Sequence, residues 1–190
     1  MPALLLHVCC APCAVLPLTE LLRRSLGSPG YFNPIYPWFY NPNIQPKEEF
    51  IRRRDALAFL CSQIPLLVPG ADIAVDFSPP YEPHVFLETV ASEPDGALEP
   101  KRCQICYRLR LKAAAIEAHK RGFEAFSTTL LYSRRQKHDL ILAEGHLAAQ
   151  EIGVKFYDED FRQGWSKGVE LGKKLGLYRQ RWCGCVYGAS

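Results

Sequence analysis

Hydrophobic residues recur along the chain at two spacings, and these spacings predict alternating strands and helices. The apolar run "ALLLHVCC" at 3–10 predicts a strand that ends in a loop. Two further strands are predicted at 124–131 and 154–160, and one or two more within 66–78. Patterns typical of helices occupy six segments: 16–26, 46–64, 83–92, 106–122, 136–152 and 165–176.

An aromatic segment at 31–43 interrupts this alternation with three prolines. Because proline cannot donate to a central ladder, the segment predicts an edge strand or a loop. The alternation as a whole predicts a three-layer α/β fold with a mostly parallel sheet, in one domain covering 1–190. Ligands of such sheets bind beyond the carboxyl ends of the strands, where strand order reverses. Three chemically rich stretches follow predicted strands there: 9–13, 128–133 and 158–162.

Composition adds little to this picture and excludes little. The chain is 48% hydrophobic and 23% charged, as globular proteins are, and its net charge of +3 permits a nucleic-acid partner without requiring one. No apolar run approaches the roughly 20 residues that span a bilayer, and the opening residues lack a basic region typical of a signal peptide. We therefore expect a cytoplasmic protein with no membrane contact.

The eight cysteines change the picture most. In a reducing cytosol they indicate metal or redox chemistry rather than disulfides. Cys61 stands alone on the apolar face of a predicted helix, which is typical of a small buried hydrophobe. The other seven form three tight groups: Cys9, Cys10 and Cys13; Cys103 and Cys106; and Cys183 and Cys185.

The spacing within each group favours metal ligation. The sulfurs of Cys103 and Cys106 lie one turn apart at a predicted helix start, where thiolates are favoured. A structural zinc or an iron–sulfur cluster takes four thiolates and a redox dithiol takes two. Seven thiols therefore indicate a cluster with a second metal or with a dithiol, and a zinc site with spare buried thiols is the alternative. In extended backbone Cys9 and Cys10 would face apart, toward two centres.

Six motifs, in order, resemble the cobalamin-independent epoxyqueuosine reductases, the QueH family, over nearly the whole chain: "LLLHVCCAPC", "FYNPNIQPKEEF", "RCQICYRLRL", "STTLLYS", "DFRQG" and "LYRQRWCGCVYG". The resemblance implies a Rossmann-like fold of the nucleotide-alpha-hydrolase type. It also implies a [4Fe-4S] cluster beside a mononuclear iron. The implied reaction reduces the epoxide of epoxyqueuosine, at the tRNA wobble position, to the alkene of queuosine, the last step of queuosine biosynthesis.

The resemblance implies that all seven grouped cysteines are metal ligands. Combined with the expected opposite directions of Cys9 and Cys10, it assigns the cluster to Cys9, Cys103, Cys106 and one tail cysteine, taken as Cys185. Cys10, Cys13 and Cys183 would then hold the single iron. The chain departs from the family where Arg134 and Arg135 follow Ser133 in place of Pro-Tyr, and in a segment before Cys103 that is poorer in Gly and Glu. Both departures bear on substrate contacts.

Reducing an epoxide to an alkene takes two electrons and two protons, and it releases water. A cluster would deliver single electrons, and an open iron would polarise the epoxide oxygen. Candidate acids near the ligands are His7, Tyr107, Asp158 and Asp160. His7 could instead be a satisfied histidine at a strand end, and Asp160 could pair with Arg162 or cap a helix.

Arginines near aromatic residues are candidates for contacting the tRNA anticodon loop, because arginine pairs with phosphate and both side-chain types stack on bases. The RNA-binding candidates are Arg134, Arg135, Arg179 and Arg181, whereas Arg52 and Arg53 are expected on a solvated helix face. We expect a monomer served by an electron-donor protein or a small reductant. One alternative is an ATP-using tRNA-thiolating enzyme. Against it, the first strand leads into cysteines rather than into an S-G-G-x-D phosphate loop. The other alternative is a zinc-stabilised nucleic-acid-binding module without chemistry.

Overall fold

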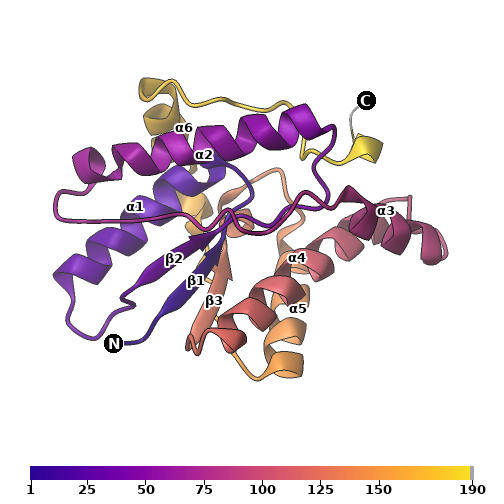
Figure 1. The fold of residues 1–190 in the computed structure, drawn as a ribbon, viewed down its shortest axis with the longest axis horizontal. Helices are drawn as coiled ribbons and strands as arrows, with labels where there is room; N and C mark the ends of the chain where they lie inside the picture. Colours follow the sequence, from indigo (N-terminus) through magenta and orange to yellow (C-terminus); the bar gives the residue numbers. More distant parts are fainter. Residues whose placement is uncertain (189–190) are drawn as a thin grey trace.

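The computed structural model describes residues 1–188, so the last two residues of the predicted 1–190 domain lie outside it (Figure 1). The strands are β1 (Leu4–His7), β2 (Ile35–Trp38), β3 (Ala125–Thr128) and β4 (Lys155–Phe156). The helices are α1 (Ala11–Gly27), α2 (Lys47–Leu67), α3 (Pro83–Ser92), α4 (Lys101–Lys120), α5 (His138–Ile152) and α6 (Trp165–Lys174), with short 3-10 turns η1 (Thr129–Tyr132), η2 (Phe161–Gly164) and η3 (Val186–Gly188).

The four strands form one parallel sheet in the order β2-β1-β3-β4. Helices α1, α2 and α6 lie together on one face, and α4 and α5 pack against each other on the opposite face (Figure 1). The three-layer α/β fold with a parallel sheet is therefore confirmed. From β1 the chain adds β2 on one side and β3 on the other, so strand order reverses at the carboxyl ends of β1 and β3. Ligand sites of α/β sheets form at such points.

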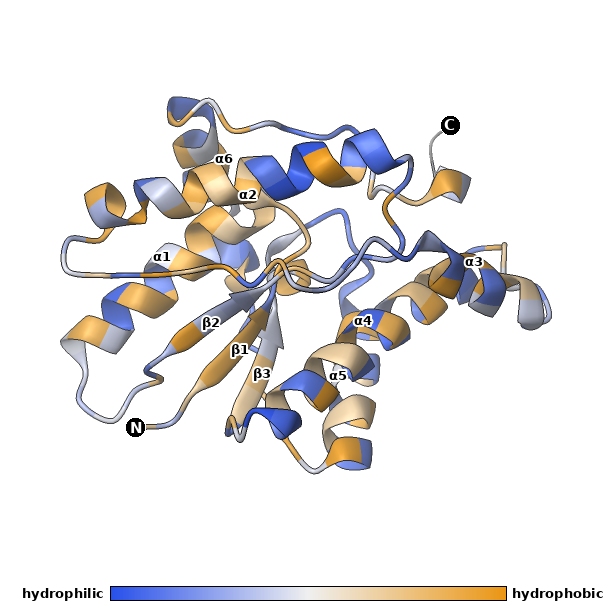
Figure 2. Cartoon of the chain, in the orientation of Figure 1, coloured by the Kyte–Doolittle hydropathy of each residue, from blue (hydrophilic) through white to orange (hydrophobic). Residues whose placement is uncertain are grey.

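Burial explains why these residues form the sheet. All four residues of β1 and of β3 are buried, as expected for parallel strands covered on both faces. Along α2, in contrast, hydrophilic and hydrophobic residues share the helix surface (Figure 2). β2 is the edge strand predicted for 31–43, and an edge tolerates Pro37 because an outward N–H needs no partner. None of the helices in residues 1–188 has the length and apolar character needed to cross a bilayer.

Several boundaries differ from prediction for local reasons. The segment 66–78 holds one isolated bridge between Trp38 and Asp76 instead of strands, because a turn follows α2 directly. β4 pairs over two residues only. Helix α1 begins at Ala11 rather than near 16, since Pro12 presets the backbone of the first helical turn. That early start places Cys13 inside the helix, next to the end of β1.

Candidate metal centre

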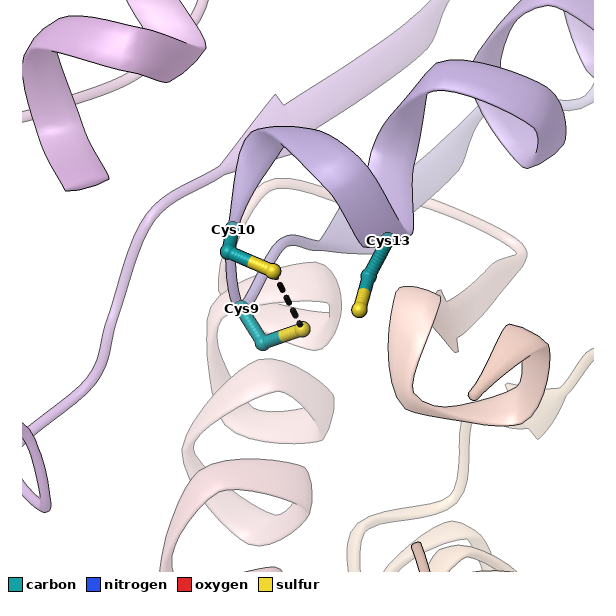
Figure 3. A group of neighbouring side chains, drawn as sticks. All are labelled: Cys9, Cys10 and Cys13. Carbon is teal, nitrogen blue, oxygen red and sulfur yellow. Dashed lines mark hydrogen bonds between the residues drawn. The ribbon is translucent and has the colours of Figure 1, made fainter. Parts of the chain in front are cut away.

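Three thiols meet where β1 passes into α1. Cys9 follows the strand, Cys10 is the extended residue before the helix (φ −173°, ψ 161°), and Cys13 lies in the first turn. The Cys9 and Cys10 sulfurs are 3.7 Å apart, and all three sulfurs lie within 4.8 Å of one another (Figure 3). The expected opposite orientation of Cys9 and Cys10 is therefore wrong. The chain changes from strand to helix at this point, so strand alternation does not apply to the pair.

A cavity of about 660 Å³ brings the three cysteine groups together at the carboxyl ends of the strands. Its lining includes all seven grouped cysteines: Cys9, Cys10, Cys13, Cys103, Cys106, Cys183 and Cys185. Cys61 lies elsewhere, buried in α2 within the hydrophobic core, as predicted. Burial raises the pKa of the Cys61 thiol to about 12, which suits an inert core residue. The sorting of eight cysteines into seven and one thus agrees with their positions.

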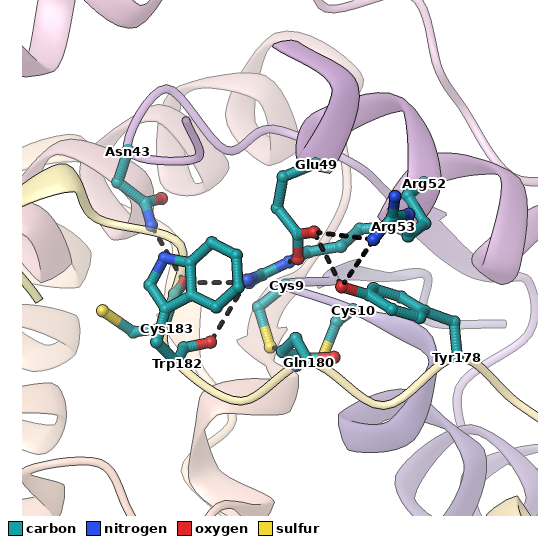
Figure 4. Close-up of polar contacts among 10 residues, drawn as sticks. All are labelled: Cys9, Cys10, Asn43, Glu49, Arg52, Arg53, Tyr178, Gln180, Trp182 and Cys183. Atoms are coloured by element: carbon teal, nitrogen blue, oxygen red, sulfur yellow. Dashed lines mark hydrogen bonds and ion pairs between the residues drawn. The ribbon is translucent and has the colours of Figure 1, made fainter. Parts of the chain in front are cut away.

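The C-terminal segment 177–188, called the tail below, reaches this cavity because α2 and the loop before α2 fix the tail's backbone. The Arg53 guanidinium donates to the Cys183 carbonyl oxygen at 2.9 Å and to Glu49 at 2.7 Å (Figure 4). The Gln45 N–H donates to the Gly184 carbonyl oxygen at 2.8 Å. Arg53 is only 2% exposed, so the solvated helix face expected for it is wrong. Its charge is used to hold the tail instead.

Polar side chains from outside the cysteine groups donate hydrogen bonds to the cavity sulfurs. The three contacts are Thr129 Oγ1 to Cys9 at 3.4 Å, Gln180 Nε2 to Cys10 at 2.8 Å, and Arg110 Nη2 to Cys106 at 3.1 Å. Such donors stabilise negative charge on sulfur. None of these three residues was among the predicted site residues. Each lies in a segment that the sequence singles out, Thr129 in 128–133, Arg110 one turn after Cys106 and Gln180 in the segment 177–188, but no local pattern indicates which side chain contacts a sulfur.

Within the group of Cys9, Cys10 and Cys13, the thiol pKa values are shifted in opposite directions. Hydrogen bonds from the thiols of Cys10 and Cys13 hold the pKa of Cys9 well below its usual value. The contacts with Cys10 and Cys9 raise the pKa of Cys13 well above it. Three thiolates this close together repel one another unless a cation lies among them. The donor set therefore fits a bound metal.

Of the predicted acids, only Tyr107 lines the cavity. Its hydroxyl donates to Gln136 Oε1 at 2.8 Å and accepts from the Lys137 N–H at 3.2 Å. Burial raises the pKa of the Tyr107 phenol above its usual value. The group therefore stays protonated at neutral pH and carries a proton at the cavity wall.

His7 lies outside the cavity lining, fully buried in β1. Its Nε2–H donates to the Tyr40 carbonyl oxygen at 3.0 Å, and its Nδ1 accepts from the Thr128 hydroxyl at 2.8 Å. Burial, and then the charge of Arg110, lower the pKa of His7 to about 4. A neutral ring with both nitrogens engaged matches the alternative interpretation, a satisfied histidine at a strand end.

The two predicted aspartates also lie outside the cavity lining. Asp158 pairs with His146 at 3.0 Å on the surface. Asp160 caps η2 and accepts from the side chain of Arg162 at 2.7 and 2.8 Å. That hydrogen bonding lowers the pKa of Asp160 to about 2, so the group is ionised at neutral pH. The alternative of pairing with Arg162 is the arrangement found.

Three of the four candidate RNA-binding arginines border the cavity with exposed side chains: Arg135, Arg179 and Arg181. Arg134 lies beside a shallower depression, and its Nη2 donates to the Arg162 carbonyl oxygen at 3.3 Å. The cavity mouth is therefore basic, and Trp165 and Trp182 line the same space.

A parallel α/β sheet with seven thiols gathered beyond its switch point defines an α/β protein with a cysteine-rich candidate metal site. Comparison with known proteins makes this specific: the family model "Epoxyqueuosine reductase QueH" matches residues 4–190. The chain belongs to this family. Relatives named epoxyqueuosine reductase QueH include the Thermotoga maritima protein, 35% identical over 98% of this chain and 90% of its own, and the Dehalococcoides mccartyi protein, 34% identical over 98% and 92%.

A Staphylococcus epidermidis relative of the same name is 30% identical over 99% of this chain and 76% of its own. Among solved structures, the A40926 pseudoaglycone deacetylase Dbv21 aligns with a TM-score of 0.44 and 14% identity. That alignment covers 82% of this chain and 62% of the deacetylase, and the likeness is too low to bear on function.

Proposed function

We propose that this chain reduces the epoxide of epoxyqueuosine, at the wobble position of tRNA, to the alkene of queuosine. The observation that carries the proposal is the convergence of seven cysteines on one cavity at the strand switch point, in a chain of the epoxyqueuosine reductase family. Residues 1–190 would act as one domain in the cytoplasm, completing queuosine biosynthesis.

The donor set fits a [4Fe-4S] cluster beside a mononuclear iron. Thiolates are the ligands that iron–sulfur clusters prefer, and seven exceed the four that one cluster needs. The buried Oε1 of Gln180, whose amide nitrogen contacts Cys10, has no hydrogen-bond partner within residues 1–188. An unsatisfied buried oxygen is costly, which is consistent with a further group at this point. The bound metals would supply single electrons and a Lewis acid.

The division of ligands between the two metals is part of the proposal, because the sulfurs of Cys9, Cys10 and Cys13 lie together and do not by themselves separate two centres. Cys103 and Cys106 of α4 would hold the cluster with Cys185 and Cys9, leaving Cys10, Cys13 and Cys183 for the iron. We expect Cys13→Ala to keep the cluster absorbance, lose about one iron and abolish turnover, and Cys9→Ala to damage the cluster itself. Iron analysis and visible absorbance distinguish the two variants. Equal loss of the cluster in both would contradict this division and leave the reductase proposal standing.

The protein's own groups would bind the substrate and supply a proton. Two C–O bonds of the epoxide break, two electrons and two protons enter, and one water leaves as the alkene forms. The Tyr107 phenol, which lines the cavity and donates to Gln136, would transfer its proton to the departing oxygen once substrate replaces that contact.

The cavity also suits a nucleoside of tRNA. Its volume of about 660 Å³ lies within the usual range of small-molecule sites. A wobble base splayed from the anticodon loop could stack on Trp165 or Trp182, while Arg179 and Arg181 at the mouth pair with phosphates. The electrons would come from a donor protein or a small reductant.

The test uses protein reconstituted anaerobically with iron and sulfide. We expect a brown protein with about five irons per chain. With a chemical reductant and tRNA carrying epoxyqueuosine, nucleoside mass spectrometry should show conversion to queuosine without ATP. A colourless preparation that binds only zinc would contradict the proposal. Transfer of sulfur to tRNA with ATP would favour the thiolating alternative instead.

A further inference from the structure

Arg110 is a buried cation whose polar partners within residues 1–188 all belong to one cysteine. The side chain is 4% exposed and lies on α4, one turn after Cys106. Its Nη2 donates to Cys106 Sγ at 3.1 Å and its Nε to the Cys106 carbonyl oxygen at 3.1 Å. The guanidinium carbon lies 5.7 Å from the centre of the Tyr107 ring. Within residues 1–188, no carboxylate forms an ion pair or hydrogen bond with Arg110.

A comparison with Arg53, the other buried arginine at this site, shows that the lack of a carboxylate partner is what distinguishes Arg110. Arg53 is equally buried, but it has the buried carboxylate of Glu49 at 2.7 Å. Guanidinium stays charged at any physiological pH, and burying it without an anion costs several kcal/mol. A neutral thiol does not offset that cost, whereas a metal-bound thiolate carries negative charge. Because no carboxylate of residues 1–188 pairs with Arg110, the negative charge that faces it must come from the cysteine site, and a metal bound through Cys106 would hold that sulfur as a thiolate.

We infer that Arg110 is the counter-charge of the metal–thiolate centre held by Cys106 and raises its reduction potential. The inference rests on the proposed function, since it requires the metal. A hydrogen bond and a positive charge at a ligand sulfur stabilise the reduced, more negative form of an iron–sulfur centre. Arg110 is a positioning residue that acts through Cys106, and it makes the centre easier to reduce before substrate binds.

The test compares Arg110→Met, which removes the charge at similar length, with Arg110→Lys, which keeps it. Lys112→Met is the matched control, because Lys112 is an exposed cation two residues away that pairs with Glu151. Reconstituted proteins without tRNA are titrated with a reductant and followed by electron paramagnetic resonance. We expect Arg110→Met to lower the ratio of reduced to oxidised centre about tenfold at a fixed potential, which is about 59 mV for one electron. Arg110→Lys should lose less, and Lys112→Met nothing.

A second measurement separates this role from simple packing. In metal-free protein no carboxylate of residues 1–188 pairs with the buried Arg110, so Arg110→Met should unfold at a temperature equal to or above that of the unsubstituted protein. Reduced iron binding by a folded Arg110→Met variant would also support the inference. An unchanged potential, or a metal-free variant that unfolds earlier, would overturn it. If the unsubstituted protein binds no iron, the proposed function fails, whereas a brown protein insensitive to Arg110→Met contradicts this inference alone.

Discussion

Replacing Gly184 by alanine should detach the tail from the cavity. Gly184 stands between Cys183 and Cys185 with φ at +101°, a backbone conformation that residues with a side chain rarely adopt. A β-carbon there would lie 3.0 Å from Arg53 Nη1 and 3.0 Å from Ile44 Cγ1. Both contacts are tighter than ordinary van der Waals distances.

The size of the effect follows from these two features. A non-glycine residue at positive φ costs about 1–3 kcal/mol. Overpacking adds about 1–3 kcal/mol, because Arg53 cannot move aside without losing its hydrogen bonds to Glu49 and the tail. The sum, about 2–6 kcal/mol, is large for a short segment held by few contacts. We therefore expect the tail to leave its position while the sheet and helices stay folded.

The assay is iron content after reconstitution, with limited proteolysis of the tail. We expect Gly184→Ala to bind less iron and to be cleaved near residues 177–185 sooner than the unsubstituted protein. Gly27→Ala is the control, because Gly27 does not have positive φ and, apart from its own helix backbone and chain neighbours, nothing lies within 4 Å of the added carbon. Full iron content and an intact tail in Gly184→Ala would refute the reasoning that this backbone conformation positions the two cysteines.

Three further predictions concern individual cysteines, the arginines at the cavity mouth and Asp160. Cys61→Ala should keep the absorbance of the reconstituted protein while Cys106→Ala loses it; bleaching by both would contradict the division of the cysteines. Replacing Arg179 and Arg181 by alanine should weaken tRNA binding and reduce its salt dependence by about one unit of slope per lost phosphate contact, with iron content unchanged. Unchanged binding at low salt would place the RNA on another face. The pKa of Asp160 lies below its ordinary 3.8 in the folded protein, so its stabilising effect is complete above about pH 4 and is lost as pH falls toward 2. Urea unfolding of Asp160→Asn should therefore approach that of the unsubstituted protein over this range, and a constant difference would refute the assignment.

The layers of the fold and the edge of the sheet that carries the site were predictable because their signals are local. An apolar run at 3–6 marks β1, aromatic and β-branched residues mark β3, and cysteines at short spacing mark the candidate metal site. The direction of Cys10 was not predictable from strand alternation, since the helix begins one residue later and turns the chain. Contacts between distant positions gave no local signal either. Gln180 meets Cys10 across 170 positions, and Arg53 reaches the tail across 130.

The cavity is built from the first, middle and last parts of the described chain, so a bound metal would connect all three. Such a link raises the free energy of unfolding in proportion to the logarithm of free metal concentration. Iron shortage should therefore loosen the tail and the start of α4 together, exposing them to cellular proteases. We expect the amount of this protein in the cell to follow the iron supply even when its synthesis is constant.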